Sequence, residues 1–75
     1  PLSMMPKGEK GVVSRVTADG PLRLRLFEMG FVPGTVVVRT GEAPLGDPLT
    51  VDVRGAEVAL RRIEAASVWI CASPE

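Results

Sequence analysis

The sequence predicts a mostly β fold, a small closed barrel of about five short strands with one short α-helix after the first strand. Two observations support this. Eight glycines and seven prolines divide the 75 residues into short pieces, only one of which has helical spacing. The later pieces are rich in β-branched residues that alternate with polar ones. Closure would remove exposed strand edges; a small open α+β sandwich is the competing architecture.

The first strand is expected at residues 10–17, where three valines lie between Gly11 and the turn signal at residues 18–20. A helix should follow directly. Asp19 can accept hydrogen bonds from the unpaired N–H groups of a first turn, and Pro21 is well tolerated near the first helical position.

The helix is predicted to bury one face. Leu22, Leu26 and Met29 recur at the spacing that places side chains on one side of a helix, and Gly30 suits a helix end. At about ten residues such a helix needs tertiary packing to be stable.

The rest of the chain reads as β structure. Leu49, Val51 and Val53 alternate with polar residues, which is the period of a half-buried strand. We expect strands at residues 35–40, 49–54, 58–60 and 67–71, a loop at residues 43–48 and a helical or 3-10 turn at residues 61–66.

One residue does not fit the alternation of the second strand. Arg39 falls where an inward apolar side chain is expected, while Val36 and Val38 occupy positions that are more often polar. Either the strand is shifted by one residue or its outer face is unusually apolar. A one-residue shift exchanges the two faces, so the choice decides which surface is apolar.

Composition excludes several classes of function. Nine basic residues balance nine acidic ones, so the chain lacks the cationic excess that is typical of a nucleic-acid-binding protein. The basic residues Arg54, Arg61 and Arg62 are expected to be solvated surface charges. Cys71 is the only cysteine, so no intrachain disulfide can form. With no apolar run of membrane-spanning length and no signal-peptide pattern, the expectation is a cytoplasmic, single-domain protein over residues 1–75 with no membrane insertion.

Catalytic and metal sites are not predicted. The chain has no histidine, so Cys71 lacks the usual base for a nucleophilic thiolate, and there is no phosphate-binding loop. Glu42, Asp47 and Asp52 are scattered without ligand-like spacing and read as solvated loop acids. We therefore expect no enzyme activity, no cofactor and no dedicated iron site within one chain.

Three segments carry a family resemblance. They are RLFEMGFVPG at residues 25–34, APLGDP at residues 43–48, and VALR at residues 58–61 followed by Glu64, Ala65 and VWI at residues 68–70. In this order and spacing they resemble the FeoA family of ferrous iron transport accessory proteins, over residues 7–70. The resemblance implies an SH3-like barrel. Leu24 departs from the family pattern, which often has a first arginine of an Arg-Arg pair at this position.

By resemblance, the function implied is that of a cytoplasmic adaptor that binds and modulates a FeoB-type ferrous iron transporter. The alternative is a stand-alone metal-responsive domain, related to the C-terminal module of iron-dependent regulators, that acts through self-association into a homo-oligomer. The DNA-binding and dimerisation helices of a whole regulator have no counterpart here.

The helix offers the first candidate surface for a partner. If Leu22 and Leu26 face the core, Leu24 and Phe27 lie about 140° to 200° around the axis, on the solvent side. Exposed apolar clusters with polar rims often mark partner sites. The alternative is that an N-terminal segment containing Leu2, Met4 and Met5 folds over them.

The second and third candidates lie in the β half. Two prolines restrict the loop of Pro44, Leu45 and Asp47, which lowers the entropy lost on docking, and Leu45 can project as an anchor. A rigid connecting turn is the alternative. Trp69 is expected on the outward face of the last strand, as a binding aromatic or as one half-buried by neighbouring loops.

Overall fold

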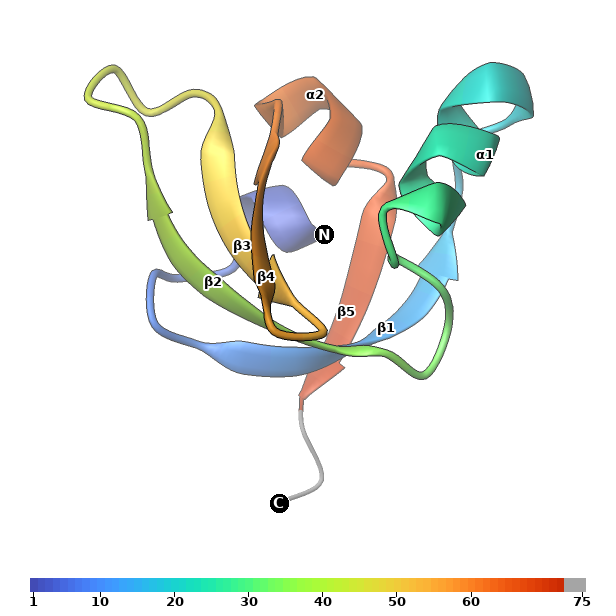
Figure 1. Cartoon of the computed structure of the whole chain (residues 1–75), viewed down its shortest axis with the longest axis horizontal. Helices are drawn as coiled ribbons and strands as arrows, with labels where there is room; N and C mark the ends of the chain where they lie inside the picture. The colour runs from blue at the N-terminus through green and yellow to red at the C-terminus, as the bar shows by residue number, and fades with distance from the viewer. Residues whose placement is uncertain (73–75) are drawn as a thin grey trace.

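The structure consists of five strands with helices in two of the connections and at the N-terminus (Figure 1). The computed structural model describes residues 1–72. The elements are a 3-10 helix η1 (Leu2–Met4), strands β1 (Lys10–Val16), β2 (Val36–Glu42), β3 (Leu49–Val53), β4 (Ala56–Leu60) and β5 (Val68–Ala72), and helices α1 (Gly20–Glu28) and α2 (Arg62–Ala65). None of the helices in this range is long and apolar enough to cross a membrane.

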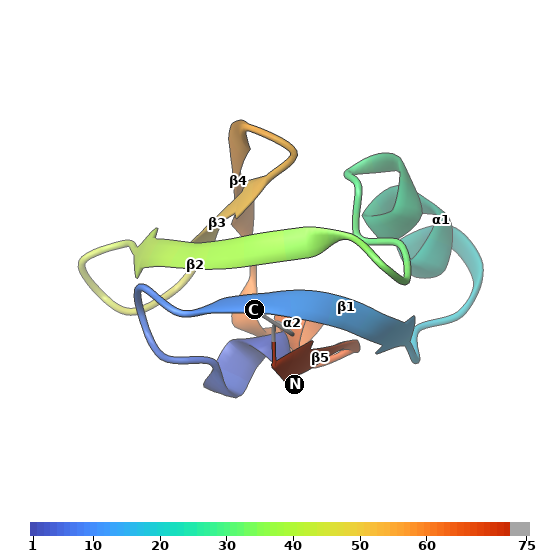
Figure 2. The ribbon, with the colours of Figure 1, turned by 90° about the horizontal axis from the view of Figure 1, so that it is seen from below.

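The five strands form one antiparallel sheet in the order β4-β3-β2-β1-β5. The sheet curls strongly, as seen from below in Figure 2, and irregular pairing between Val13 and Arg15 and between Arg39 and Gly41 interrupts its ladders. The strand number and the position of α1 agree with the prediction. The predicted closure by strand pairing is wrong, because β5 pairs with β1 and leaves β4 at the other edge.

Every strand contributes inward side chains to one core. In β3, Leu49, Val51 and Val53 are buried while Thr50 and Asp52 are partly exposed, which confirms the predicted alternation. The largest fully buried side chains are Leu2, Val13, Leu26, Phe31, Val37, Leu49, Val51, Leu60 and Val68.

Helix α1 packs through Leu26, which is fully buried, and ends where Gly30 turns the chain with a φ of 107°. A Cβ on Gly30 would lie 2.8 Å from Val53 Cγ1, so only glycine allows this close approach to β3. Asp19 is the N-cap residue, but its carboxylate accepts no N–H of the helix, contrary to expectation. Gly20 follows with a φ of 56°, outside the helical range, so the first turn lacks standard cap geometry.

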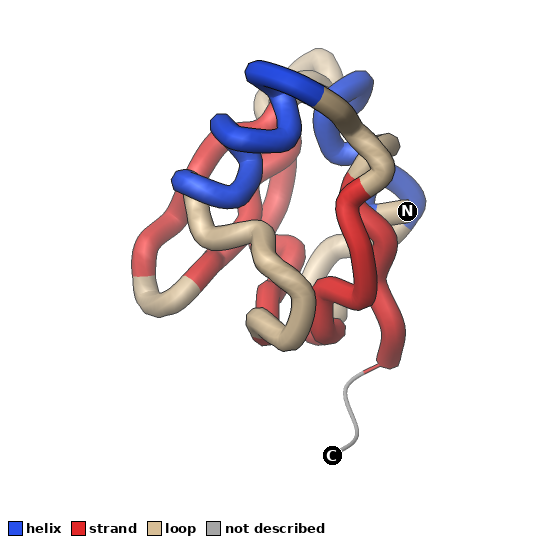
Figure 3. The backbone as a smooth tube through the Cα atoms, turned by 90° about the vertical axis from the view of Figure 1, so that its right-hand side faces the viewer, coloured by secondary structure: helices blue, strands red, loops and turns tan. Residues whose placement is uncertain are grey.

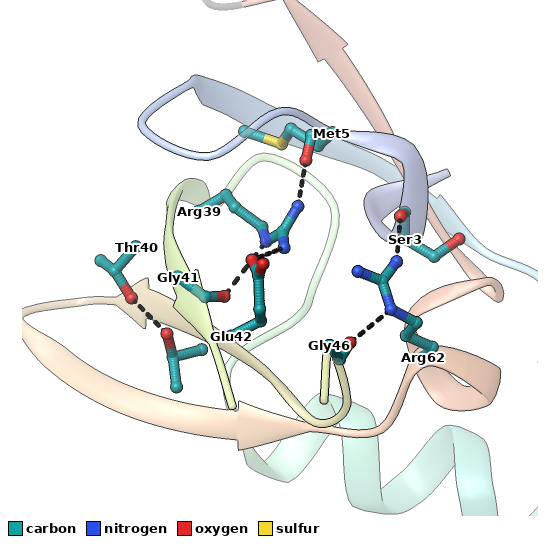
Figure 4. A network of polar contacts seen from close by, with 9 residues as sticks. Ser3, Met5, Arg39, Thr40, Gly41, Glu42, Gly46 and Arg62 are labelled. Atoms are coloured by element: carbon teal, nitrogen blue, oxygen red, sulfur yellow. Dashed lines mark hydrogen bonds and ion pairs between the residues drawn. The ribbon is translucent and has the colours of Figure 1, made fainter. Parts of the chain in front are cut away.

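Arg39 points inward, and this resolves the face of β2. Val37 is buried and Val36 is 48% exposed, so the strand is not shifted by one residue. The second alternative holds: the outer face of β2 is unusually apolar. The Arg39 guanidinium is buried against three acceptors (Figure 4). It donates to the Gly41 carbonyl at 3.2 Å, to the Met5 carbonyl at 2.6 Å and to the Glu42 carboxylate at 2.6 Å.

Replacing Arg39 with Met should lower the free energy of unfolding by about 2–3 kcal/mol, because two buried carbonyls would lose their donor. Glu42→Gln is the matched control. It removes the charge of a partner that is 40% exposed, so we expect a loss of less than about 1 kcal/mol. Urea denaturation measures both values, and an Arg39→Met protein as stable as the control would contradict the structural role of Arg39.

The β3–β4 turn contains a strained residue. Arg54 has a φ of 55° and is followed by Gly55 with a φ of 84°, while the Gly55 N–H donates to Asp52 Oδ1 at 3.1 Å. Asparagine adopts this conformation more readily than arginine. We therefore expect Arg54→Asn to raise the free energy of unfolding by about 0.5 kcal/mol.

Gly55→Ala, by contrast, should lower it by about 1 kcal/mol, because alanine disfavours a positive φ. Denaturation curves with unchanged slope test both changes. If Arg54→Asn is destabilising, the 3.5 Å hydrogen bond from Arg54 to the Thr35 hydroxyl outweighs the strain.

Candidate partner-docking surface

Helix α2 lies at the centre of one end of the barrel. Figures 1 and 3 show α1 and α2 at the same end, and Figure 1 places the β2–β3 loop on the other side of α2. Side chains join the three segments. Arg25 of α1 pairs with Glu64 of α2 at 2.8 Å, and the backbone N–H of Arg62 donates to Asp47 Oδ1 at 3.1 Å.

Each of these three segments exposes one large aliphatic side chain. Leu24 in α1 is 60% exposed, Leu45 in the loop is 97% exposed and Ile63 in α2 is 80% exposed. We call these three residues the barrel-end surface. Their neighbours include the Arg25–Glu64 ion pair, so apolar groups stand among charged ones, as at many partner sites.

The structure separates the two residues predicted on the outer face of α1. Leu24 is exposed as expected, but the exposure predicted for Phe27 is wrong. Phe27 is half-buried against the core, and the Arg23 guanidinium lies 5.2 Å from the centre of its ring. The buried arc of the helix is wide enough to include Leu22, Leu26 and Phe27, so helical spacing gave its centre but not its width.

The N-terminal segment does not cover the exposed side of α1. Leu2 and Met5 are buried in the core, while Met4 is 77% exposed. Helix η1 packs chiefly against α2 and β5. The segment therefore leaves Leu24 uncovered, and Met4 lies beside Ile70, Cys71 and Ala72 of β5.

The β2–β3 loop combines a rigid turn with a projecting side chain. The Ala43 N–H donates to the Pro48 carbonyl at 2.9 Å, and the Gly46 N–H donates to the Ala43 carbonyl at 2.7 Å. Pro44 is exposed, and Leu45 projects almost completely into solvent. The carboxylate of Asp47 accepts the N–H of the first residue of α2, which ties the loop to the helix.

Trp69 belongs to β5, and its side-chain and carbonyl contacts are with β1. Its ring is half-buried, with the Arg15 guanidinium 5.1 Å from its centre, and its carbonyl accepts the Ser14 hydroxyl. The indole Nε1 is buried and has no acceptor among the described residues. Both neighbours belong to β1, so Trp69 is not brought together with Leu24 or Leu45.

The acidic residues considered from the sequence make separate contacts. Glu42 pairs with Arg39, while Asp47 and Asp52 accept backbone N–H groups at different turns. Within residues 1–72, no three His, Cys, Asp or Glu side chains are grouped as metal ligands.

Ile63 was missed in the sequence reasoning, although a signal was available. The short helix was predicted, and Ala65 at its end is fully buried. Residues two apart on a helix lie about 200° apart around its axis, so a buried Ala65 places Ile63 in solvent. Assigning Ala65 as the inward residue of the predicted turn would have placed Ile63 in solvent.

Comparison with known proteins identifies the same family over nearly the whole chain. The model of the FeoA domain matches residues 1–71. A Porphyromonas gingivalis protein described as an Fe(2+) transport protein A/Fe(2+) transporter FeoB fusion is 39% identical over 69 residues. That match covers 92% of this chain but only 8% of the fusion protein, so the chain spans a small part of this relative.

Solved structures agree in fold. Iron(II) transport protein A from Clostridium thermocellum is 32% identical with a TM-score of 0.90, covering 95% of this chain and 44% of that one. Stenotrophomonas maltophilia FeoA, solved with zinc and described as an SH3 domain protein, is 36% identical with a TM-score of 0.82, covering 93% and 87%.

A manganese-dependent transcriptional repressor shares the fold alone, at 19% identity and a TM-score of 0.85 over 96% of this chain and 40% of that one. The fold class predicted from the sequence, a mostly β SH3-like domain, is thus confirmed. On the family match and the identity to its relatives, the chain belongs to the FeoA family, which is linked to ferrous iron transport.

Proposed function

We propose that this chain is a cytoplasmic accessory protein that binds a FeoB-type ferrous iron transporter through the barrel-end surface. The fusion protein carries this proposal, since its description places an FeoA-type and a FeoB-type part in one polypeptide. Fusion holds two modules at a high effective concentration, which favours contacts between them. A separate chain lacks this high effective concentration, so it needs a surface with enough affinity to bind the transporter on its own.

The three exposed side chains suit this role. Large apolar side chains that become desolvated at an interface provide much of its binding energy. Ion pairs at the rim, such as Arg25–Glu64, favour one orientation of the partner. Phe27, Pro44 and Asp47 remain proposed contacts at the margins of this surface, and Trp69 remains a separate proposed contact on β5.

Modulation of transport follows from binding without any catalytic step. A bound protein shifts a transporter between conformations only if it binds one of them more tightly. The proposed adaptor therefore acts by preferring one state of the cytoplasmic part of the transporter. Iron is the cargo of the transporter in this scheme.

A second candidate function is metal-linked self-association. The Stenotrophomonas maltophilia relative was solved with zinc, and this observation favours testing the idea. Carboxylates such as Asp47 and Glu42 would then have to combine across two copies of the chain, since a ferrous or zinc site needs several convergent donors.

Replacing Leu24, Leu45 or Ile63 singly with Ser should weaken binding to the FeoB-type transporter of the same organism by about five- to tenfold each. The measurement is the dissociation constant for the transporter in nanodiscs by biolayer interferometry. Val36→Ser is the matched control, because Val36 is an exposed aliphatic residue at the start of β2. Unchanged affinity in the triple variant would refute this surface.

For the second candidate, adding Fe²⁺ or Zn²⁺ should shift the chain from monomer to dimer in analytical ultracentrifugation. An Asp47→Asn variant should require more metal for the same shift, because a carboxylate donor is lost. A sedimentation coefficient that does not change up to millimolar metal would exclude metal-linked dimerisation.

A further inference from the structure

Arg62 connects three segments at the end of the barrel. Its Nε donates to the Gly46 carbonyl at 2.5 Å, and one terminal nitrogen donates to the Ser3 carbonyl at 3.1 Å (Figure 4). Its backbone N–H donates to Asp47 Oδ1 at 3.1 Å. One half-buried residue thus holds the β2–β3 loop and the N-terminal 3-10 helix against α2.

Two of the segments joined by Arg62 carry the two most exposed large hydrophobic side chains of the described residues. Leu45 and Ile63 are 97% and 80% exposed, and each is adjacent in sequence to Arg62 or to its carbonyl partner Gly46. The arginine itself places its donors inward on carbonyls. It is therefore suited to arranging these apolar residues rather than to contacting a partner.

The bonds within the loop cannot provide this arrangement, and the Asp47 carboxylate holds only the end of the loop next to β3. The two backbone hydrogen bonds of residues 43–48 close the turn on itself, but they do not fix the turn relative to α2. A planar guanidinium can donate to two carbonyls in different directions at once, whereas a lysine ammonium forms a compact point charge. Ordering a loop before docking removes that entropy cost from the binding step.

We propose that Arg62 is a positioning residue for partner binding, which fixes Leu45 of the β2–β3 loop relative to Ile63 of α2. The proposal rests on the docking function proposed above and adds a residue that acts through others. It identifies the mechanism as preorganisation: the free protein already holds the geometry that the transporter binds.

The test compares Arg62→Met with Arg61→Met, which removes an equal charge from the neighbouring exposed arginine. Affinity for the FeoB-type transporter in nanodiscs and amide hydrogen exchange of residues 43–48 are measured on both proteins. Arg62→Met should bind about tenfold more weakly and exchange faster in the loop, while Arg61→Met should stay within about twofold of the wild type. Arg62→Lys should be intermediate, since it can satisfy one carbonyl.

A double-mutant cycle separates positioning from a general loss of stability. Leu45→Ser should weaken binding in the wild type but have little further effect in the Arg62→Met protein, because the loop no longer presents Leu45. Equal affinities of Arg62→Met and Arg61→Met, with a wild type that binds, would overturn the role of Arg62 and keep the docking function. A wild type that does not bind the transporter would overturn the docking function. In that case, equal amide hydrogen-exchange rates of residues 43–48 in the two variants would also overturn the role of Arg62 in ordering the loop.

Discussion

The fold depends on a buried arginine that fastens the N-terminal segment to the sheet. Arg39 donates to the Met5 carbonyl through its side chain, and its own backbone pairs with Gly8 and Glu9. A domain of this size buries only about 60% of its unfolded surface, so each apolar contribution to the core matters. Leu2 and Met5 provide such contributions from a segment that has no strand pairing of its own. Burying the charged Arg39 side chain thereby allows the side chains of Leu2 and Met5 to join the core.

A second arginine repeats this chemistry at the end of the barrel, where the candidate surface lies. Arg62 also donates to carbonyls, and its partner Ser3 is 59 residues away in sequence. Helix α2 has only four residues, too few to be stable alone, yet it receives contacts from α1, the β2–β3 loop and η1. Its position is set by these tertiary contacts. The surface around it thus consists of short pieces held by long-range bonds.

Local signals predicted the elements well, whereas long-range contacts decided what was missed. The alternation of Leu49, Val51 and Val53 and the helical spacing of Leu22 and Leu26 are local, and both elements formed as expected. The burial of Arg39 could not be decided, because its acceptor at Met5 lies 34 residues away.

The candidate surface shows the same division. Leu24 was found by counting around a helix, and Leu45 by the composition of its loop. Phe27 was misjudged because the width of a buried helical face depends on what packs against it, here including Arg23. The pairing of β5 with β1 is likewise a long-range contact, which alternation along the chain does not encode.

The pairing of β1 with β5 has a consequence during synthesis. The Ser14 hydroxyl bonds to the Trp69 carbonyl across 55 residues, whereas β2, β3 and β4 pair with neighbours that follow within a few residues. The meander of β2, β3 and β4 depends on contacts that are close in sequence. One side of β1, by contrast, stays unpaired until β5 has been synthesised. A truncation before residue 68 would therefore leave this side of β1 as an exposed strand edge, with unpaired backbone groups open to association with other chains.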